Sequence, residues 1–214
     1  MTYYPIMLDL TGKHILVVGG GKVAERRIKG LLETKATITV ISPKVTGLIK
    51  ELSAEGRIQW KKKRFETADL SGAFYIISAT NDKEVSETIK QAAPPHQLLN
   101  LADNPEESNV ALPSVIRRGR LILTVSTSGA SPKLAKQISR QLAQTFDESY
   151  EPYLDFLFKW RERIKKEIRD SQVKEKLLSR LLEEDLFNHP EREKIFSTLF
   201  HQLQNDIKNR QSND

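Results

Sequence analysis

Apolar runs alternate with helical periods over the first hundred residues. Apolar residues at helical spacing predict three helices. The first follows the glycines after Val18, the second covers residues 44–54, and the third starts at residues 80–82 and ends near Ala92. Six apolar runs around these helices predict strands, at residues 5–10, 15–18, 36–41, 57–60, 73–79 and 97–101. Strands and helices in alternation are typical of the α/β class, so we expect a Rossmann-like, doubly wound, mostly parallel sheet.

The pattern changes after residue 112. Two strand-like runs, 114–118 and 121–126, flank Gly119 and predict an antiparallel hairpin. A helix should follow, with Ser131 as its N-cap and Pro132 at its first position. Helical stripes of leucine and aromatic residues dominate the remaining chain and indicate packing faces. We therefore expect three parts: an α/β domain at 1–112, a hairpin-plus-helix region at 113–147 and a helical C-terminal domain at 148–214.

Composition narrows the class of protein. The chain has 214 residues, of which 38% are hydrophobic and 29% charged, as in folded globular proteins. It has no cysteine, which excludes disulfides, a thiolate nucleophile and cysteine metal sites, and permits a reducing cytoplasm. No basic leader and no run of 18 apolar residues occur, so we expect neither a signal peptide nor a membrane span. The formal charge of +6 is spread along the chain, which suits a solvated surface or a polyanionic small molecule.

A glycine-rich turn organises the first domain. It follows the buried run 15–18 and precedes a helical stripe, the context that gives a G-x-G-x-x-G/A motif its meaning. Gly19, Gly21 and Ala24 fill the three small positions of that motif. The first allows the tight turn, the second lets the backbone approach a pyrophosphate, and the third lets helix pack on strand. Dinucleotide binding is therefore the favoured interpretation, and a glycine turn without a ligand is the alternative.

Ligands of doubly wound sheets bind outside the carboxyl ends of the strands. The loops in question are 19–23, 41–44, 78–82 and 100–104. Asp103 directly follows the last predicted strand and could act as a general base. The same residue could equally cap a turn before Pro105, and its position alone favours neither role.

The residues that would select the cofactor are unusual. The acidic residue that reads the adenosine ribose, about 20 residues beyond the glycines, is missing. Ser42 could bind the ribose instead, and Lys44 could favour a 2′-phosphate, so spacing leaves NAD and NADP both open. The basic run 61–64 is interpreted as a solvated edge rather than a binding site.

Other common kinds of site have no support. The histidines show no metal-ligand spacing, so no metal site is predicted. No His or Asp is arranged in sequence around Ser128 or Ser131, so a hydrolase triad is not predicted either.

Several motifs in a fixed order resemble the siroheme-synthase N-terminal family of precorrin-2 dehydrogenases, in the form without a methyltransferase domain. Besides Pro5, Ile6 and Leu8, they are VVGGGKVAERR (17–27), ITVISP (38–43), SATND (78–82), NLAD (100–103), LPSVIRRGRLILTVSTSGASP (112–132) and LAKQISRQL (134–142). The resemblance covers about residues 1–150, and the helical tail matches only loosely.

The resemblance implies an NAD-dependent oxidoreductase that converts precorrin-2, a tetrapyrrole, to sirohydrochlorin in siroheme biosynthesis. It implies that Asp103 is the catalytic carboxylate and assigns the cofactor-binding residues by position. Gly19, Gly21, Lys22 and Val23 would hold the pyrophosphate, Pro43 and Lys44 would lie near the adenosine, and Thr80 and Asn81 would line the nicotinamide side. Some relatives also insert ferrous iron.

The resemblance also bears on assembly and regulation. It implies a homodimer formed through residues 113–146, in agreement with a hairpin and helix that extend beyond the sheet and need covering. The serine loop from Ser126 to Gly129 departs from that of the phosphorylated fused enzyme, so the resemblance does not carry over regulation by phosphoserine. We expect a cytoplasmic protein with no nucleic-acid or membrane partner.

Three other classes of protein are compatible with parts of the sequence. A nucleotide-sensing regulatory Rossmann domain would share the glycine motif but would need neither Asp103 nor the hairpin. A nucleic-acid binder would use the basic tail, whose charges alternate in sign and form no stripe. An NADP-dependent reductase of another small acid would explain Lys44. All three rank below the dehydrogenase.

Overall fold

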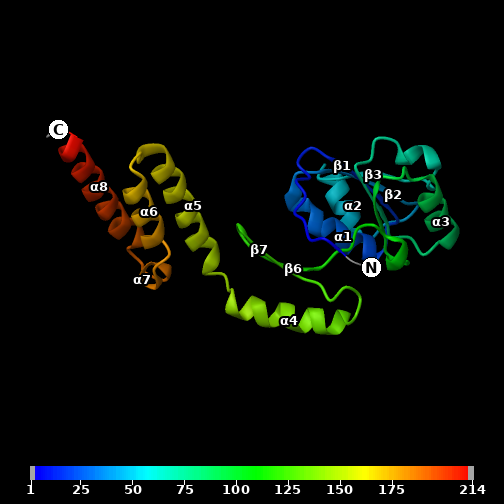
Figure 1. Ribbon diagram of the computed structural model, residues 1–214. Coiled ribbons are helices and arrows are strands. Elements are labelled where there is room, and N and C mark those ends of the chain that lie inside the picture. Colours follow the sequence, from blue (N-terminus) through cyan, green and yellow to red (C-terminus); the bar gives the residue numbers. More distant parts are fainter. Residues whose placement is uncertain (1–2, 212–214) are drawn as a thin grey trace. The chain divides into compact units, whose positions relative to one another are not determined.

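The computed structural model describes residues 3–211. It divides into two compact units, Met1–Leu112 and Pro113–Asp214 (Figure 1). Each is described by itself below. The expected further boundary at residue 147, inside the second unit, stays a proposal.

The first unit is built on a five-stranded sheet in the order β3-β2-β1-β4-β5, and every neighbouring pair of strands is parallel. The strands are β1 (His14–Val18), β2 (Thr37–Ile41), β3 (Gln59–Lys61), β4 (Tyr75–Ser78) and β5 (Leu98–Leu101). This order confirms the predicted doubly wound sheet.

Helices cover both faces of this sheet (Figure 1). They are α1 (Lys22–Leu31), α2 (Gly47–Ala54) and α3 (Lys83–Ala92), with short 3₁₀ turns η1 (Leu32–Thr34), η2 (Thr67–Leu70) and η3 (Pro105–Glu107). On one face, Ile28 of α1 and Ile49 of α2 pack in a core with Val17 of β1. On the other, Ile89 of α3 packs with Leu16. Neighbouring residues of β1 thus enter different cores, which explains the continuous apolar run.

The strand predicted at residues 5–10 is wrong. Those residues have no strand pairing, and Ile6 and Met7 are 62% and 70% exposed, with Leu10 the buried end of the segment. A short apolar run lacks the information that distinguishes a paired strand from extended chain on the surface, and Pro5 removes one hydrogen-bond donor.

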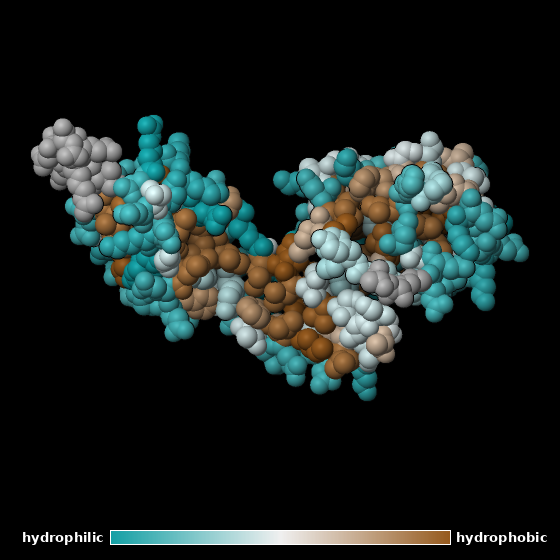
Figure 2. Space-filling view, viewed as in Figure 1, coloured by the Kyte–Doolittle hydropathy of each residue, from teal (hydrophilic) through white to brown (hydrophobic). Residues whose placement is uncertain are grey.

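The second unit begins with the predicted hairpin. Strands β6 (Ser114–Arg118) and β7 (Leu121–Val125) pair antiparallel. Gly119 in their turn has φ +53°, and a Cβ there would lie 2.8 Å from the Cγ of Glu151. Helix α4 (Pro132–Thr145) follows and packs on both strands. The hydroxyl oxygen of Ser131 accepts a hydrogen bond from the Leu134 N–H at 3.2 Å, which confirms the predicted N-cap. Apolar surface gathers over the hairpin and α4 (Figure 2).

The rest of the second unit is helical. Helices α5 (Tyr150–Glu167), α6 (Ser171–Arg180), α7 (Glu184–Phe187) and α8 (Arg192–Gln211) surround an aromatic core. Trp160 of α5 lies against Phe196 and Phe200 of α8, with ring centroids 5.0 and 5.4 Å apart. The leucine and aromatic stripes therefore form packing faces, as predicted. Leu182 is the exception, at 68% exposed.

Candidate functional site

The glycine turn lies at the carboxyl edge of the sheet, between β1 and α1. Gly19 has φ +112°, and a Cβ on it would lie 2.3 Å from the backbone oxygen of Ala79. Its N–H donates to the Ile41 oxygen at 2.9 Å, which ties the turn to the end of β2. Only glycine fits there.

The other two glycines have different surroundings. A Cβ on Gly20 would lie 2.3 Å from the Lys44 backbone oxygen, whereas one on Gly21 would have nothing within 4 Å. Gly21 is the N-cap of α1 and supplies no side-chain hydrogen bond. The first turn of α1 therefore starts beside open space. Its free N–H groups, which include those of Lys22 and Val23, are accessible to an anion. The motif assigns no role to Gly20, so its tight packing was not predicted. The third glycine in a row was the signal that could have indicated it.

A cavity of about 580 Å³ opens at the same edge. The ends of β1 and β2 contribute Val18, Gly19, Ile41, Ser42 and Pro43, and the chain beyond β3 contributes Arg64 and Phe65. The segment from β4 into α3 contributes Thr80, Asp82, Glu84, Val85 and Thr88. Half of these lining residues are polar or charged, so the cavity suits a polar small molecule better than an apolar one.

Sequence reasoning found four of these residues, namely Gly19, Ser42, Pro43 and Thr80. It missed Arg64 and Phe65, which lie beyond a short strand, and the residues of α3. Arg64 is exposed, as the interpretation of 61–64 as a solvated edge requires, but it also lines the cavity. A charge run does not show which of its members borders a cavity.

The predicted cofactor residues outside the cavity wall are all exposed. The ammonium of Lys22 lies 3.4 Å from the carboxylate of Glu25, and its side chain is 85% exposed. Lys44 and Asn81 are exposed loop residues, and Val23 is 38% exposed. The structure brings these residues to the sheet edge but not into the cavity.

Two predicted polar side chains hold the loops in shape. The Ser42 hydroxyl donates to the Lys44 backbone oxygen at 2.6 Å. The Thr80 hydroxyl oxygen accepts from the Asp82 N–H at 3.1 Å. Asp82 in turn accepts hydrogen bonds from two N–H groups of α3, so it is the helix-start residue that the sequence predicted.

Asp103 lies in the exposed loop beyond β5, at the same edge of the sheet, but it does not line the cavity. The hydroxyl of Ser108 accepts from the Leu101 N–H at 2.8 Å and donates to the Asn104 oxygen at 3.3 Å. Asn104, rather than Asp103, is the N-cap of η3. Among the residues that the structure describes, none donates a hydrogen bond to the Asp103 carboxylate, so the loop does not use it as a cap.

These residues fit a dinucleotide. The space at Gly21 and the first turn of α1 suit a diphosphate. Between Ile41, Phe65 and Val85 the cavity suits a flat base, and Ser42 lies where an adenosine ribose is read in this fold.

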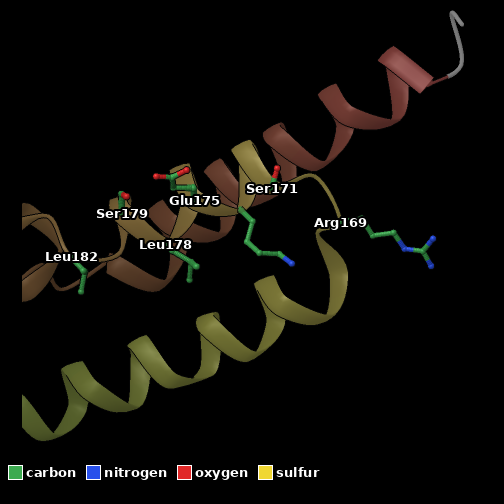
Figure 3. A pocket seen from close by; sticks show the side chains of 7 residues that line it. Arg169, Ser171, Glu175, Leu178, Ser179 and Leu182 are labelled. Carbon is green, nitrogen blue, oxygen red and sulfur yellow. The ribbon is translucent and has the colours of Figure 1, made fainter.

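The second unit has a hollow of its own, of about 380 Å³, along α6 (Figure 3). It is lined by Arg169, Ser171, Lys174, Glu175, Leu178, Ser179 and Leu182. The Arg169 side chain extends away from the others, so the charged groups do not converge. Within the described part of the chain no group of three or more His, Cys, Asp and Glu could hold a metal ion. The carboxyl edge of the sheet is therefore the stronger candidate site.

Comparisons with known proteins show the family of the chain. The model of a family described as "Putative NAD(P)-binding" matches residues 6–114, and that of the "SirC C-terminal domain" family matches residues 150–195. The precorrin-2 dehydrogenase of Priestia megaterium is 41% identical over 181 residues, which cover 85% of this chain and 90% of that protein. A solved structure described as "SirC, precorrin-2 dehydrogenase" is 38% identical with a TM-score of 0.83, and the match covers 94% of this chain and 100% of that one.

A longer relative matches as well. Siroheme synthase 3 of Aeromonas hydrophila is 32% identical over 186 residues. These cover 86% of this chain but 40% of that protein, so the likeness concerns one part of it.

Proposed function

Because the chain belongs to the precorrin-2 dehydrogenase family, we propose that it oxidises precorrin-2 to sirohydrochlorin at the carboxyl edge of its parallel sheet. Family membership makes it an NAD-dependent oxidoreductase of the siroheme pathway. The observation that carries the proposed location is the first turn of α1, which starts after Gly21, where a Cβ would meet nothing within 4 Å, and two residues beyond Gly19 in the cavity wall.

Cofactor binding follows from the turn and the cavity. Gly19, Gly21 and the N–H groups of Lys22 and Val23 would hold the diphosphate at the positive end of the α1 dipole. The cavity would take the adenosine, with Ser42 and Pro43 in its wall and Lys44 next to them in the chain. Thr80 and Asn81 would lie toward the nicotinamide. When bound, NAD supplies the hydride acceptor.

Asp103 is the proposed proton acceptor. Oxidation of precorrin-2 to sirohydrochlorin removes two hydrogens, one as a hydride to the nicotinamide and one as a proton. Asp103 lies beyond β5, which neighbours β4, so it is one strand farther along the sheet edge than Thr80. Its carboxylate is exposed and receives no hydrogen bond from the described residues, which leaves both oxygens free to accept the proton.

A tetrapyrrole substrate suits the charge of the chain. Precorrin-2 is fringed with carboxylates, and a protein with a formal charge of +6 attracts it. No helix in the part of the chain that the structure describes is long and apolar enough to cross a membrane. A cytoplasmic location is proposed on the need for NAD, and the cysteine-free sequence is compatible with a reducing compartment.

A homodimer is proposed from the second unit. Among the described residues its hairpin has two strands and packs on α4, yet none of the residues of β7 is buried. Val115 on β6 is 53% exposed and Leu134 on α4 is 47% exposed. The apolar surface over these elements (Figure 2) is what a second copy would cover.

Ferrous iron insertion is a second candidate activity. Its support is the likeness to a siroheme synthase, a protein named for an iron-containing product. In this activity the iron is a substrate.

One assay tests both activities. The purified protein is given precorrin-2 and NAD without oxygen, and the absorbances of sirohydrochlorin and NADH are followed. We expect both to rise in equal amounts. Absence of both with wild-type protein that binds NAD would refute the dehydrogenase. Ferrous iron is then added. If sirohydrochlorin disappears no faster than it does by spontaneous metallation without the protein, the second activity is refuted.

A further inference from the structure

Arg64 differs from the rest of its basic run. The ammonium of Lys63 lies 3.1 Å from the carboxylate of Glu66 and 2.9 Å from that of Asp69, so acidic neighbours offset its charge. Arg64 lines the cavity. Over residues 3–206, whose side chains are described, it forms no hydrogen bond or ion pair. The cavity wall therefore carries an uncommitted guanidinium.

Strand pairing brings the backbone that leads to Arg64 beside the end of β2. Val40 of β2 is in register with Trp60 of β3, and the Trp60 indole N–H donates to the Ser42 oxygen at 2.9 Å. The Ser42 N–H donates to the Lys61 oxygen at 3.4 Å, which ties the two strand ends together. Arg64 follows three residues later. It thus shares the cavity wall with Ser42, at the position that reads the adenosine ribose in this fold.

The end of β2 lacks the group that would reject a phosphorylated ribose. An acidic residue there bonds the ribose 2′-hydroxyl and repels a 2′-phosphate, whereas a nearby arginine accommodates the phosphate. Here Ser42 and Pro43 take that place. The acidic cavity residues, Asp82 and Glu84, come from the start of α3, which follows β4 on the other side of β1. Lys44 and Arg64 are both exposed, but Arg64 lines the cavity and Lys44 does not, so Arg64 is the cation in position.

We propose that Arg64 is a specificity-determining residue that binds a 2′-phosphate on the adenosine ribose, so that the chain takes NADP in addition to NAD. The inference rests on the proposed placement of the dinucleotide. A guanidinium binds phosphate through two parallel N–H donors, and Arg64 has all its donors available.

Calorimetric titration distinguishes the contribution of the 2′-phosphate to binding affinity from that of the rest of the cofactor. The probes are NAD, NADP, 5′-AMP and adenosine 2′,5′-bisphosphate, and the proteins are wild type, Arg64→Ala and Lys62→Ala. Lys62 is an exposed member of the same run that does not line the cavity, so its variant removes an equal charge. We expect Arg64→Ala to weaken NADP and the bisphosphate by about tenfold or more, because a charge-assisted phosphate contact is lost. NAD and AMP should change less than about threefold, and Lys62→Ala should change none of the four beyond that.

A second variant tests the same contact with the opposite charge. Arg64→Glu places a carboxylate in the cavity wall and should weaken NADP and the bisphosphate more than Arg64→Ala does. Wild-type protein that binds NAD but not NADP would overturn the inference alone, as would Arg64→Ala weakening both cofactors equally. Failure of the wild type to bind NAD would instead refute the proposed function.

Discussion

At the scale of single residues, the carboxylate of Asp103 is the strongest test of the proposed chemistry. Asp103→Asn keeps the shape of the side chain but cannot accept a proton at neutral pH. We expect turnover of precorrin-2 to fall by about 10²–10⁴, the usual effect of losing a general base. NAD affinity and melting temperature should change little, because the side chain is exposed and caps nothing.

The control is Asn104→Asp, which moves a carboxylate to the adjacent N-cap position. It should not rescue Asp103→Asn in the double variant. Turnover by Asp103→Asn within about threefold of wild type would show that the proton leaves to water, since a base contributes far more.

The adjacent glycines Gly20 and Gly21 should respond to substitution in opposite ways. Gly20→Ala forces a methyl group to within 2.3 Å of the Lys44 backbone oxygen and should lower the free energy of unfolding by about 1–3 kcal/mol. A Cβ at Gly21 would meet nothing within 4 Å, so the fold should accept Gly21→Asp. Its carboxylate would lie where the diphosphate binds, and NAD affinity should be lost. Thermal unfolding and calorimetry distinguish the two effects, and wild-type NAD affinity in Gly21→Asp would make the turn purely structural.

At the scale of elements, the sequence predicts those strands and helices whose formation depends on neighbouring residues in the chain. The parallel strands were predictable because β1 is apolar on both faces, and α4 because Ser131 and Pro132 mark its start. The segment at residues 5–10 could not be distinguished from a strand, because pairing depends on neighbours that are distant in sequence. Arg64 was missed for the same reason, since the pairing of β3 with β2 brings it to the cavity.

The cap of α4 provides a test at this scale. Ser131→Ala removes the hydroxyl that accepts the Leu134 N–H and should lower the free energy of unfolding by about 1 kcal/mol. Ser171→Ala is the matched control, because Ser171 is the first residue of α6 and Asp170 caps that helix. Urea unfolding measures both. Equal stability of the two variants would mean that the α4 cap contributes nothing.

At the scale of the whole molecule, the proposed homodimer accounts for the apolar surface of the second unit. A two-stranded sheet and one helix bury little on their own, and β7 has no residue among the buried hydrophobic ones. Two copies could pack hairpin against hairpin, which removes apolar side chains such as Val115 from water on both copies at once.

Light scattering at micromolar concentration should therefore give twice the mass of one chain. Val115→Asp should shift the mass toward that of the monomer, because each dimer would bury two carboxylates in an apolar interface. Val115 is 53% exposed, so the monomer itself should still fold. Leu182→Asp makes the same kind of change on a 68% exposed leucine outside the hairpin and should leave the dimer intact. A monomeric wild type would refute the dimer, and equal effects of the two variants would place the interface elsewhere.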